Sequence, residues 1–140
     1  MKINYIDEDV FDIYIMNEKI KDIDFNNNKE LEKYLKKLFN VLKDNYSINI
    51  EGFYDVCIYI DKYYGIVIHM EKESSYFSCY KDIEMRITIK NSTFLYQIDN
   101  YIENKKIHII NNNMYLEITD SKDLINIIEN TNYILYDYSK

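Results

Sequence analysis

One amphipathic segment constrains this sequence more than any other feature. Between residues 28 and 45 leucines recur every three or four positions while lysines occupy the opposite side, the pattern of a helix with one buried face. Asn27 precedes the segment and Glu30 follows three residues later, which is typical of a capped helix start. The predicted apolar face comprises Leu31, Tyr34, Leu35, Leu38, Phe39, Val41 and Leu42. This face requires a second layer to cover it.

Alternating apolar residues flank the helix on both sides. Residues 2–6 and 10–15 surround a short acidic turn and predict an antiparallel hairpin. Residues 52–60 and 66–70 predict a second hairpin around Gly65, a position suited to a positive backbone φ. The first half is therefore predicted as a two-layer β-β-α-β-β unit, with one helix laid on a sheet.

The second half of the chain is richer in predicted strands. Residues 107–110 and 114–118 flank three asparagines, which tolerate left-handed backbone and so predict a hairpin turn. Residues 94–99 are apolar but do not distinguish a strand from a short helix. The remaining predicted elements are strands at 85–89 and 133–136 and a short helix at 121–130.

Together these segments predict an α+β protein. It has two layers of mainly antiparallel sheet and helix, with one long helix at about 28–45 and one short C-terminal helix at about 121–130. We expect the whole chain to form one compact domain. Its possible subdomains are 1–70 and 83–140, joined by the connector 71–82.

Composition excludes several classes of function. The formal net charge is −7, with 24 acidic and 17 basic residues, so the clustered cations of a nucleic-acid binder are missing. The only glycines, Gly52 and Gly65, are too few for phosphate or dinucleotide loops, and the acidic cluster at 7–12 lacks the ligand spacing of a calcium loop. No stretch resembles a membrane span or a secretory leader. We therefore expect a cytoplasmic protein without cofactor, nucleic-acid partner or membrane contact.

Only one potentially catalytic pair follows from the strand pattern. Cys57 and His69 are expected on neighbouring strands, on the face away from the helix, where they suggest a thiolate–imidazole pair. Asp55 and Asp61 share that face and are candidate acid–base partners. A small thiol- or metal-dependent enzyme using Cys57 and His69 with either aspartate is therefore one hypothesis. Unrelated residues on a half-exposed sheet face explain the same pattern, so no catalytic residue and no metal ligand is assigned.

Tyrosine is unusually frequent, with 16 residues. The codon bias of an AT-rich bacterial genome explains much of this excess, together with the excess of Ile, Asn and Lys. Exposed tyrosines also provide large contact area at low entropic cost, as they do in protein-binding surfaces. From their strand and turn positions we expect Tyr54, Tyr59, Tyr63 and Tyr64 to form a protein-contact surface.

Several segments resemble the N-terminal domain of MecA-type adaptor proteins. The resemblance rests on residues 1–15, the leucine-rich helix, Ile50-Glu51-Gly52-Phe53 ahead of a strand, and the strand led by Gly65. Residues 85–99 and 114–116 are similar to a shortened MecA C-terminal domain, while the family's acidic linker is absent. The resemblance implies that the N-terminal part holds substrates and that the C-terminal part docks on a Clp-family unfoldase. It transfers no individual functional residue.

The first hypothesis is thus a non-enzymatic cytosolic protein-interaction module, an adaptor or regulator with a protein partner. The alternatives are the thiol- or metal-dependent enzyme described above and a structural accessory domain of a larger assembly. The sequence pattern leaves the oligomeric state open.

Overall fold

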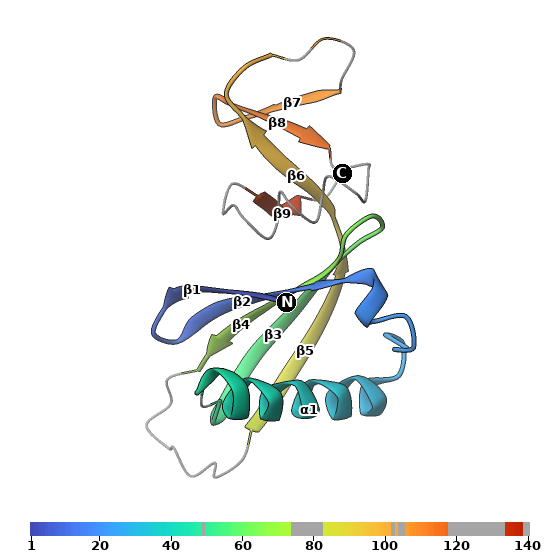
Figure 1. Ribbon diagram of the computed structural model, residues 1–140, viewed down its shortest axis with the longest axis vertical. Coiled ribbons are helices and arrows are strands. Elements are labelled where there is room, and N and C mark those ends of the chain that lie inside the picture. Colours follow the sequence, from blue (N-terminus) through green and yellow to red (C-terminus); the bar gives the residue numbers. More distant parts are fainter. Residues whose placement is uncertain (49, 74–82, 102, 104–105, 118–133, 139–140) are drawn as a thin grey trace.

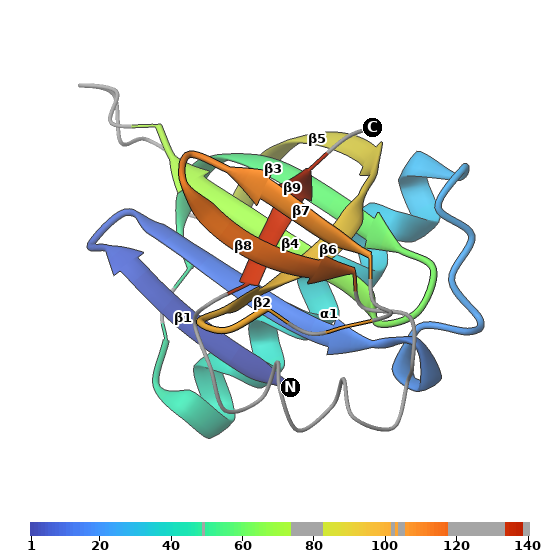
Figure 2. The same ribbon diagram turned by 90° about the horizontal axis from the view of Figure 1, so that it is seen from above.

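The computed structural model describes residues 1–48, 50–73, 83–101, 103, 106–117 and 134–138. Helix α1 lies across one face of a five-stranded sheet, and a four-stranded sheet lies beyond the other face (Figure 1). Seen from above, the four-stranded sheet stacks over the five-stranded one (Figure 2). The elements are β1 (Lys2–Asp7), β2 (Val10–Met16), the 3-10 helix η1 (Asn17–Lys19), α1 (Asn28–Tyr46), β3 (Gly52–Asp61), β4 (Gly65–Lys72), β5 (Ile83–Asn91), β6 (Thr93–Ile98), β7 (Ile107–Ile110), β8 (Asn113–Glu117) and β9 (Ile134–Tyr138).

The predicted long helix and its cap are confirmed. The Asn27 side chain accepts a hydrogen bond from the Glu30 N–H at 3.2 Å, and Ser47 ends the helix in left-handed backbone with φ 56°. Val41 was expected on the buried face but is 43% exposed, because it lies roughly a quarter turn around the helix from the leucine row. The buried helix residues are Leu31, Leu35, Phe39 and Leu42.

The five-stranded sheet has the order β1-β2-β4-β3-β5 and confirms the β-β-α-β-β arrangement of the first half. Its neighbours pair antiparallel except β3 and β5, which run parallel. The face toward α1 is apolar throughout, since alternate residues of each strand join the leucines of the helix in one core. The strand residues buried in this core include Phe11, Ile13, Ile15, Val56, Ile58, Ile66, Ile68 and Met70.

Gly65 closes the β3–β4 hairpin, as its position in the sequence predicted. Its φ is 140°, in the region that L side chains rarely adopt. A Cβ at this position would lie 2.3 Å from the carbonyl oxygen of Ile15 on the neighbouring strand β2. Glycine is therefore required both by the turn and by the close approach of β2.

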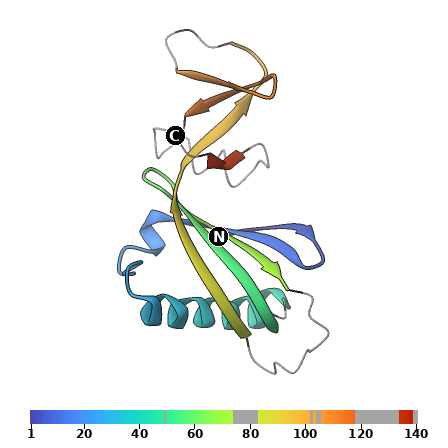
Figure 3. The ribbon, with the colours of Figure 1, turned by 180° about the vertical axis from the view of Figure 1, so that it is seen from behind.

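The division between the two sheets differs from the predicted subdomain boundary. Residues 83–140 were considered as a possible second subdomain of one compact domain, but β5 pairs with β3 in the five-stranded sheet. The division between the sheets therefore falls at Ser92, between β5 and β6, where one nearly continuous strand passes from the first sheet to the second (Figure 3). The alternation of apolar residues in β5 correctly predicted a strand. Such alternation does not indicate which other strand β5 will pair with.

The four-stranded sheet has the order β7-β8-β6-β9. Residues 94–99, which were ambiguous, belong mainly to strand β6. The predicted asparagine turn is confirmed, since Asn111 and Asn112 have φ values of 51° and 67°. The strand predicted at 133–136 is confirmed as β9, which lies at one edge of this sheet. The short helix predicted at 121–130 lies outside the described residues.

A cluster of aromatic residues joins the two sheets. The cluster contains five buried residues. From the first sheet and the β3–β4 turn come Tyr14, Val67 and Tyr64, and from the second sheet come Phe94 and Ile134. Tyr136 of β9 adds edge-on ring contacts with Tyr14 and Tyr59, at centroid separations of 6.2 and 5.2 Å. Within the described residues, no helix combines the length and the apolar character that crossing a membrane requires.

Candidate functional site

Polar side chains lie in register on the face of the five-stranded sheet that α1 leaves uncovered. One row crosses four strands in the order β2, β4, β3 and β5, and consists of Asp12, His69, Cys57 and Thr88. The row toward the free ends of the β3–β4 hairpin consists of Val10, Glu71, Asp55 and Arg86. The predicted placement of Cys57 and His69 on neighbouring strands is therefore confirmed.

His69 is held by carboxylates at both ring nitrogens. Its Nδ1 lies 2.6 Å from Oδ1 of Asp12, and its Nε2 lies 2.9 Å from Oε1 of Glu71. Asp12 is only 1% exposed, and its Oδ2 accepts a second hydrogen bond, at 2.7 Å, from the Tyr136 hydroxyl. Tyr136 belongs to the four-stranded sheet, so Asp12 links a histidine of one sheet to a tyrosine of the other.

The two carboxylates keep His69 protonated. The hydrogen bond with Asp12 is the largest influence and raises the pKa of His69 to about 9, with Glu71 adding to the effect and burial opposing it. At neutral pH the ring is therefore an imidazolium that donates at both nitrogens. Its charge also compensates the buried carboxylate of Asp12, which burial alone would disfavour.

The neighbouring tyrosines remain protonated for a related reason. Burial, followed by the hydrogen bond with Asp12, raises the pKa of Tyr136 far above its ordinary value. Burial also raises the pKa values of Tyr14 and Tyr59, and the negative charge of Asp12 adds to both shifts. At neutral pH the hydroxyl groups of these tyrosines therefore remain protonated and can donate hydrogen bonds.

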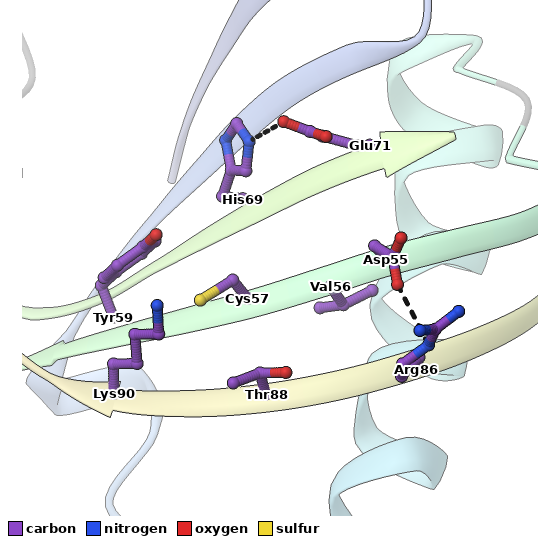
Figure 4. A pocket seen from close by; sticks show the side chains of 9 residues that line it. All are labelled: Asp55, Val56, Cys57, Tyr59, His69, Glu71, Arg86, Thr88 and Lys90. Atoms are coloured by element: carbon purple, nitrogen blue, oxygen red, sulfur yellow. Dashed lines mark hydrogen bonds and ion pairs between the residues drawn. The ribbon is translucent and has the colours of Figure 1, made fainter. Parts of the chain in front are cut away.

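An open pocket of about 350 Å³ lies over this face, lined by residues of β3, β4 and β5 (Figure 4). Arg86 forms one side, with its Nε 3.2 Å from Oδ1 of Asp55 and its guanidinium 5.5 Å from the centre of the Phe53 ring. The half-buried thiol of Cys57 lies between His69 and the β5 side of the pocket. The lining residues are Asp55, Val56, Cys57, Tyr59, His69, Glu71, Arg86, Thr88 and Lys90.

The catalytic pair considered from the sequence is not assembled as a nucleophile and base. Both nitrogens of His69 are hydrogen-bonded to carboxylates, which leaves neither one to accept a proton from the Cys57 thiol. The thiol instead interacts with the side chain of Tyr59 on its own strand. Register brings Cys57 and His69 together, but the acidic neighbours of His69 decide its hydrogen bonding.

The two aspartates proposed as acid–base partners have different surroundings. Asp55 forms the exposed ion pair with Arg86. Asp61 is 3% exposed and belongs to the sheet junction. Its Oδ1 accepts hydrogen bonds from the backbone N–H groups of Tyr63 and Tyr64, and its Oδ2 accepts one from the backbone N–H of Phe94 at 2.9 Å. Asp61 is therefore not positioned as an acid–base partner of Cys57 and His69, because its three hydrogen bonds hold backbone N–H groups and it does not line the pocket.

The predicted tyrosine surface must also be corrected. Tyr54 and Tyr64 are 4% and 2% exposed, because Tyr54 joins the core beneath the sheet and Tyr64 joins the aromatic cluster between the sheets. Tyr63 is 40% exposed in the hairpin turn. Tyr59 is half-buried and lines the pocket. Tyr54 is therefore buried because it shares the helix-side face of β3 with Val56 and Ile58, and Tyr64, in the hairpin turn, is buried because the second sheet packs against it.

Potential metal ligands do not assemble into a metal site in the part of the chain that the structure describes. No group of three or more His, Cys, Asp or Glu side chains there has the geometry to hold a metal ion. His108, the other histidine, lies in the four-stranded sheet with its Nε2 2.8 Å from Oε1 of Glu117. The second cysteine, Cys79, lies outside the described residues.

Sequence reasoning missed three members of this site, namely Asp12, Glu71 and Tyr136. Asp12 had one available signal, because it interrupts the apolar strand 10–15 with a charge on the face opposite the core. Matching the hairpin registers would then have placed it opposite His69. Tyr136 gave no such signal, because 124 residues separate it from Asp12 along the chain.

Comparisons of this chain with protein-family models, with curated proteins and with solved structures gave no match.

Proposed function

We propose that this chain is a non-enzymatic protein-interaction module, an adaptor or a regulator, and that its contact site is the pocket on the uncovered sheet face. The observation that carries the proposal is the internal pairing of most of the pocket's charged groups, although Lys90 has no ion-pair partner among the described residues. Asp55 is paired with Arg86, and His69 with Asp12 and Glu71. Paired charges fix side-chain positions before a partner arrives, which lowers the entropic cost of binding.

The chemistry of the pocket suits a polar segment of another protein. Its floor carries the Thr88 hydroxyl and the Cys57 thiol, and the ring of Tyr59 forms part of the wall. Tyrosine and arginine, both present in this lining, are enriched in protein contact sites, where tyrosine contributes area and hydrogen bonds together. The protonated state of His69 favours binding over general-base catalysis.

Kinship with MecA-type adaptors is retained in this proposal on the strength of the sequence pattern alone. A cytoplasmic location is likewise retained as an expectation from the sequence. Neither is needed for the binding proposal, which depends on the pocket residues.

A pair of substitutions at Cys57 tests the proposal. Cys57→Leu fills the floor of the pocket with a larger apolar side chain, whereas Cys57→Ser keeps a small side chain of nearly the same size as the thiol. The tagged chain and both variants would be used to capture proteins from a lysate of the source cells. We expect a partner to be recovered by the wild type and by Cys57→Ser, and to be lost with Cys57→Leu.

Circular dichroism establishes that each variant is folded before capture. Recovery of the same partner by Cys57→Leu and Cys57→Ser would place the contact site elsewhere. A wild-type capture that contains no specific protein would contradict the proposal itself.

A further inference from the structure

The outer edge of β5 differs from the opposite edge of the same sheet. β5 pairs with β3 over nine consecutive residue positions, and no described strand lies on its other side. β1, at the opposite edge, is six residues long, and its pairing is interrupted by a register shift between Tyr5 and Asp7. Short or bulged edges resist further pairing, whereas a long regular edge leaves backbone N–H and C=O groups available for another strand.

The side chains of β5 alternate between two chemically different faces. Met85, Ile87 and Ile89 lie on the helix side, partly buried against the apolar core. The pocket side is exposed and carries, in order, Glu84, Arg86, Thr88 and Lys90. Glu84 and Lys90 have no ion-pair partner among the described residues, although Arg86 between them is paired with Asp55.

The geometry points to a second copy of this chain as the strand that pairs with this edge. We propose that two copies associate through antiparallel pairing of β5 with β5, centred on Ile87. In this register Glu84 of each copy faces Lys90 of the other, so both unpaired charges acquire partners. On the helix side Met85 faces Ile89 and Ile87 faces its own counterpart, which extends the apolar core across the junction.

Antiparallel pairings centred one residue earlier or one residue later along β5 are less favourable. Centring the pairing on Arg86 places two guanidinium groups opposite each other, and centring it on Thr88 places Arg86 opposite Lys90. The register centred on Ile87 also pairs the full length of β5, from Ile83 to Asn91. Charge and strand length therefore select the same arrangement.

Antiparallel pairing also separates the bulky parts of the two copies. The two-fold axis passes midway between the two Ile87 residues and is perpendicular to the sheet, so both α1 helices lie on one side of a ten-stranded sheet. In one copy, β6 continues from the C-terminal end of β5 (Figure 3). In the proposed dimer the two four-stranded sheets would therefore lie at opposite ends. Glu84 of the second copy then stands beside Lys90 at the rim of the pocket.

Charge reversal tests this pairing on the full chain. Sedimentation equilibrium over a concentration series is expected to give a reversible dimer for the wild type. Lys90→Glu and Glu84→Lys each place two like-charged pairs across the junction and are expected to raise the dimer dissociation constant by about tenfold or more. The double variant, with both charges exchanged, is expected to restore the wild-type constant. Lys37→Glu is the control, since Lys37 is exposed on α1 and its substitution changes the net charge equally.

Hydrogen exchange provides a second, independent measurement. The amides of residues 84–91 that point away from β3 are expected to become protected as the wild-type concentration rises, and to lose that protection in Lys90→Glu. A wild type that stays monomeric at every concentration overturns the inference, as does a dimer insensitive to both single reversals. The Cys57 variants above leave β5 unchanged, so a failure of this pairing is distinguishable from a failure of the binding proposal.

Discussion

The two faces of the five-stranded sheet are built by different chemistry. On the α1 face the buried strand residues are aliphatic or aromatic, and they meet Leu31, Leu35, Phe39 and Leu42 of the helix. On the opposite face the buried groups include the carboxylates of Asp12 and Asp61, together with tyrosines that contact the four-stranded sheet. One face is therefore held by apolar burial and the other by burial combined with directional bonds.

This difference implies different sensitivities to substitution. Apolar burial is non-directional and depends mainly on volume, so the helix face responds to cavities. A buried carboxylate depends on each of its donors, so the tyrosine-rich face responds to single polar atoms. The predictions below test this contrast, in order of decreasing expected effect.

The largest effect is expected at Leu35, which is fully buried beneath the sheet. Leu35→Ala should lower the free energy of unfolding by about 4 kcal/mol, because it removes apolar contacts and leaves a cavity. Denaturant titration followed by circular dichroism measures the change. Val41→Ala, at the 43% exposed position on the same helix, should cost roughly 0.5 kcal/mol or less. Equal losses at the two positions would contradict the assigned helix face.

Asp61 on the opposite face should be nearly as sensitive, although it contributes little apolar area. Asp61→Ala leaves the N–H groups of Tyr63, Tyr64 and Phe94 without their acceptor and should cost about 3 kcal/mol. Asp61→Asn keeps one acceptor oxygen and should cost less than the alanine variant. The same denaturant titration applies. A negligible loss for Asp61→Ala would mean that the sheet junction does not depend on these bonds.

His69 should make stability dependent on pH. Its pKa is raised from 6.5 to about 9 in the folded state, so its stabilising contribution is complete below pH 6.5 and is lost as the pH rises through 9. With allowance for solvent screening, the loss should be on the order of 1 to 2 kcal/mol. Denaturant titrations of wild type and His69→Gln across this range measure it.

The variants at this site separate the histidine from its tyrosine neighbour. His69→Gln should remove the pH-dependent decline, while Tyr136→Phe should retain it, because the latter leaves the His69–Asp12 pair in place. Parallel pH profiles for wild type and His69→Gln would exclude the proposed protonation of His69.

Local periodicity was sufficient to predict most elements of the structure. The spacing of leucines determined α1, the alternation in residues 52–60 and 66–70 determined the β3–β4 hairpin, and asparagine chemistry determined the β7–β8 turn. The same alternation correctly placed Cys57 and His69 on one face. All of these features depend on neighbours along the chain, whose geometry is dictated by backbone sterics and burial of one face.

Tertiary structure decided which predicted outer positions became buried and which side chains met. The transfer of β5 to the first sheet, the burial of Tyr64, and the role of Asp61 all depend on packing between distant segments. The link from His69 through Asp12 to Tyr136 is of the same kind. A repeating pattern indicates which face of a helix or strand is apolar, but it does not indicate which distant segment will cover the other face.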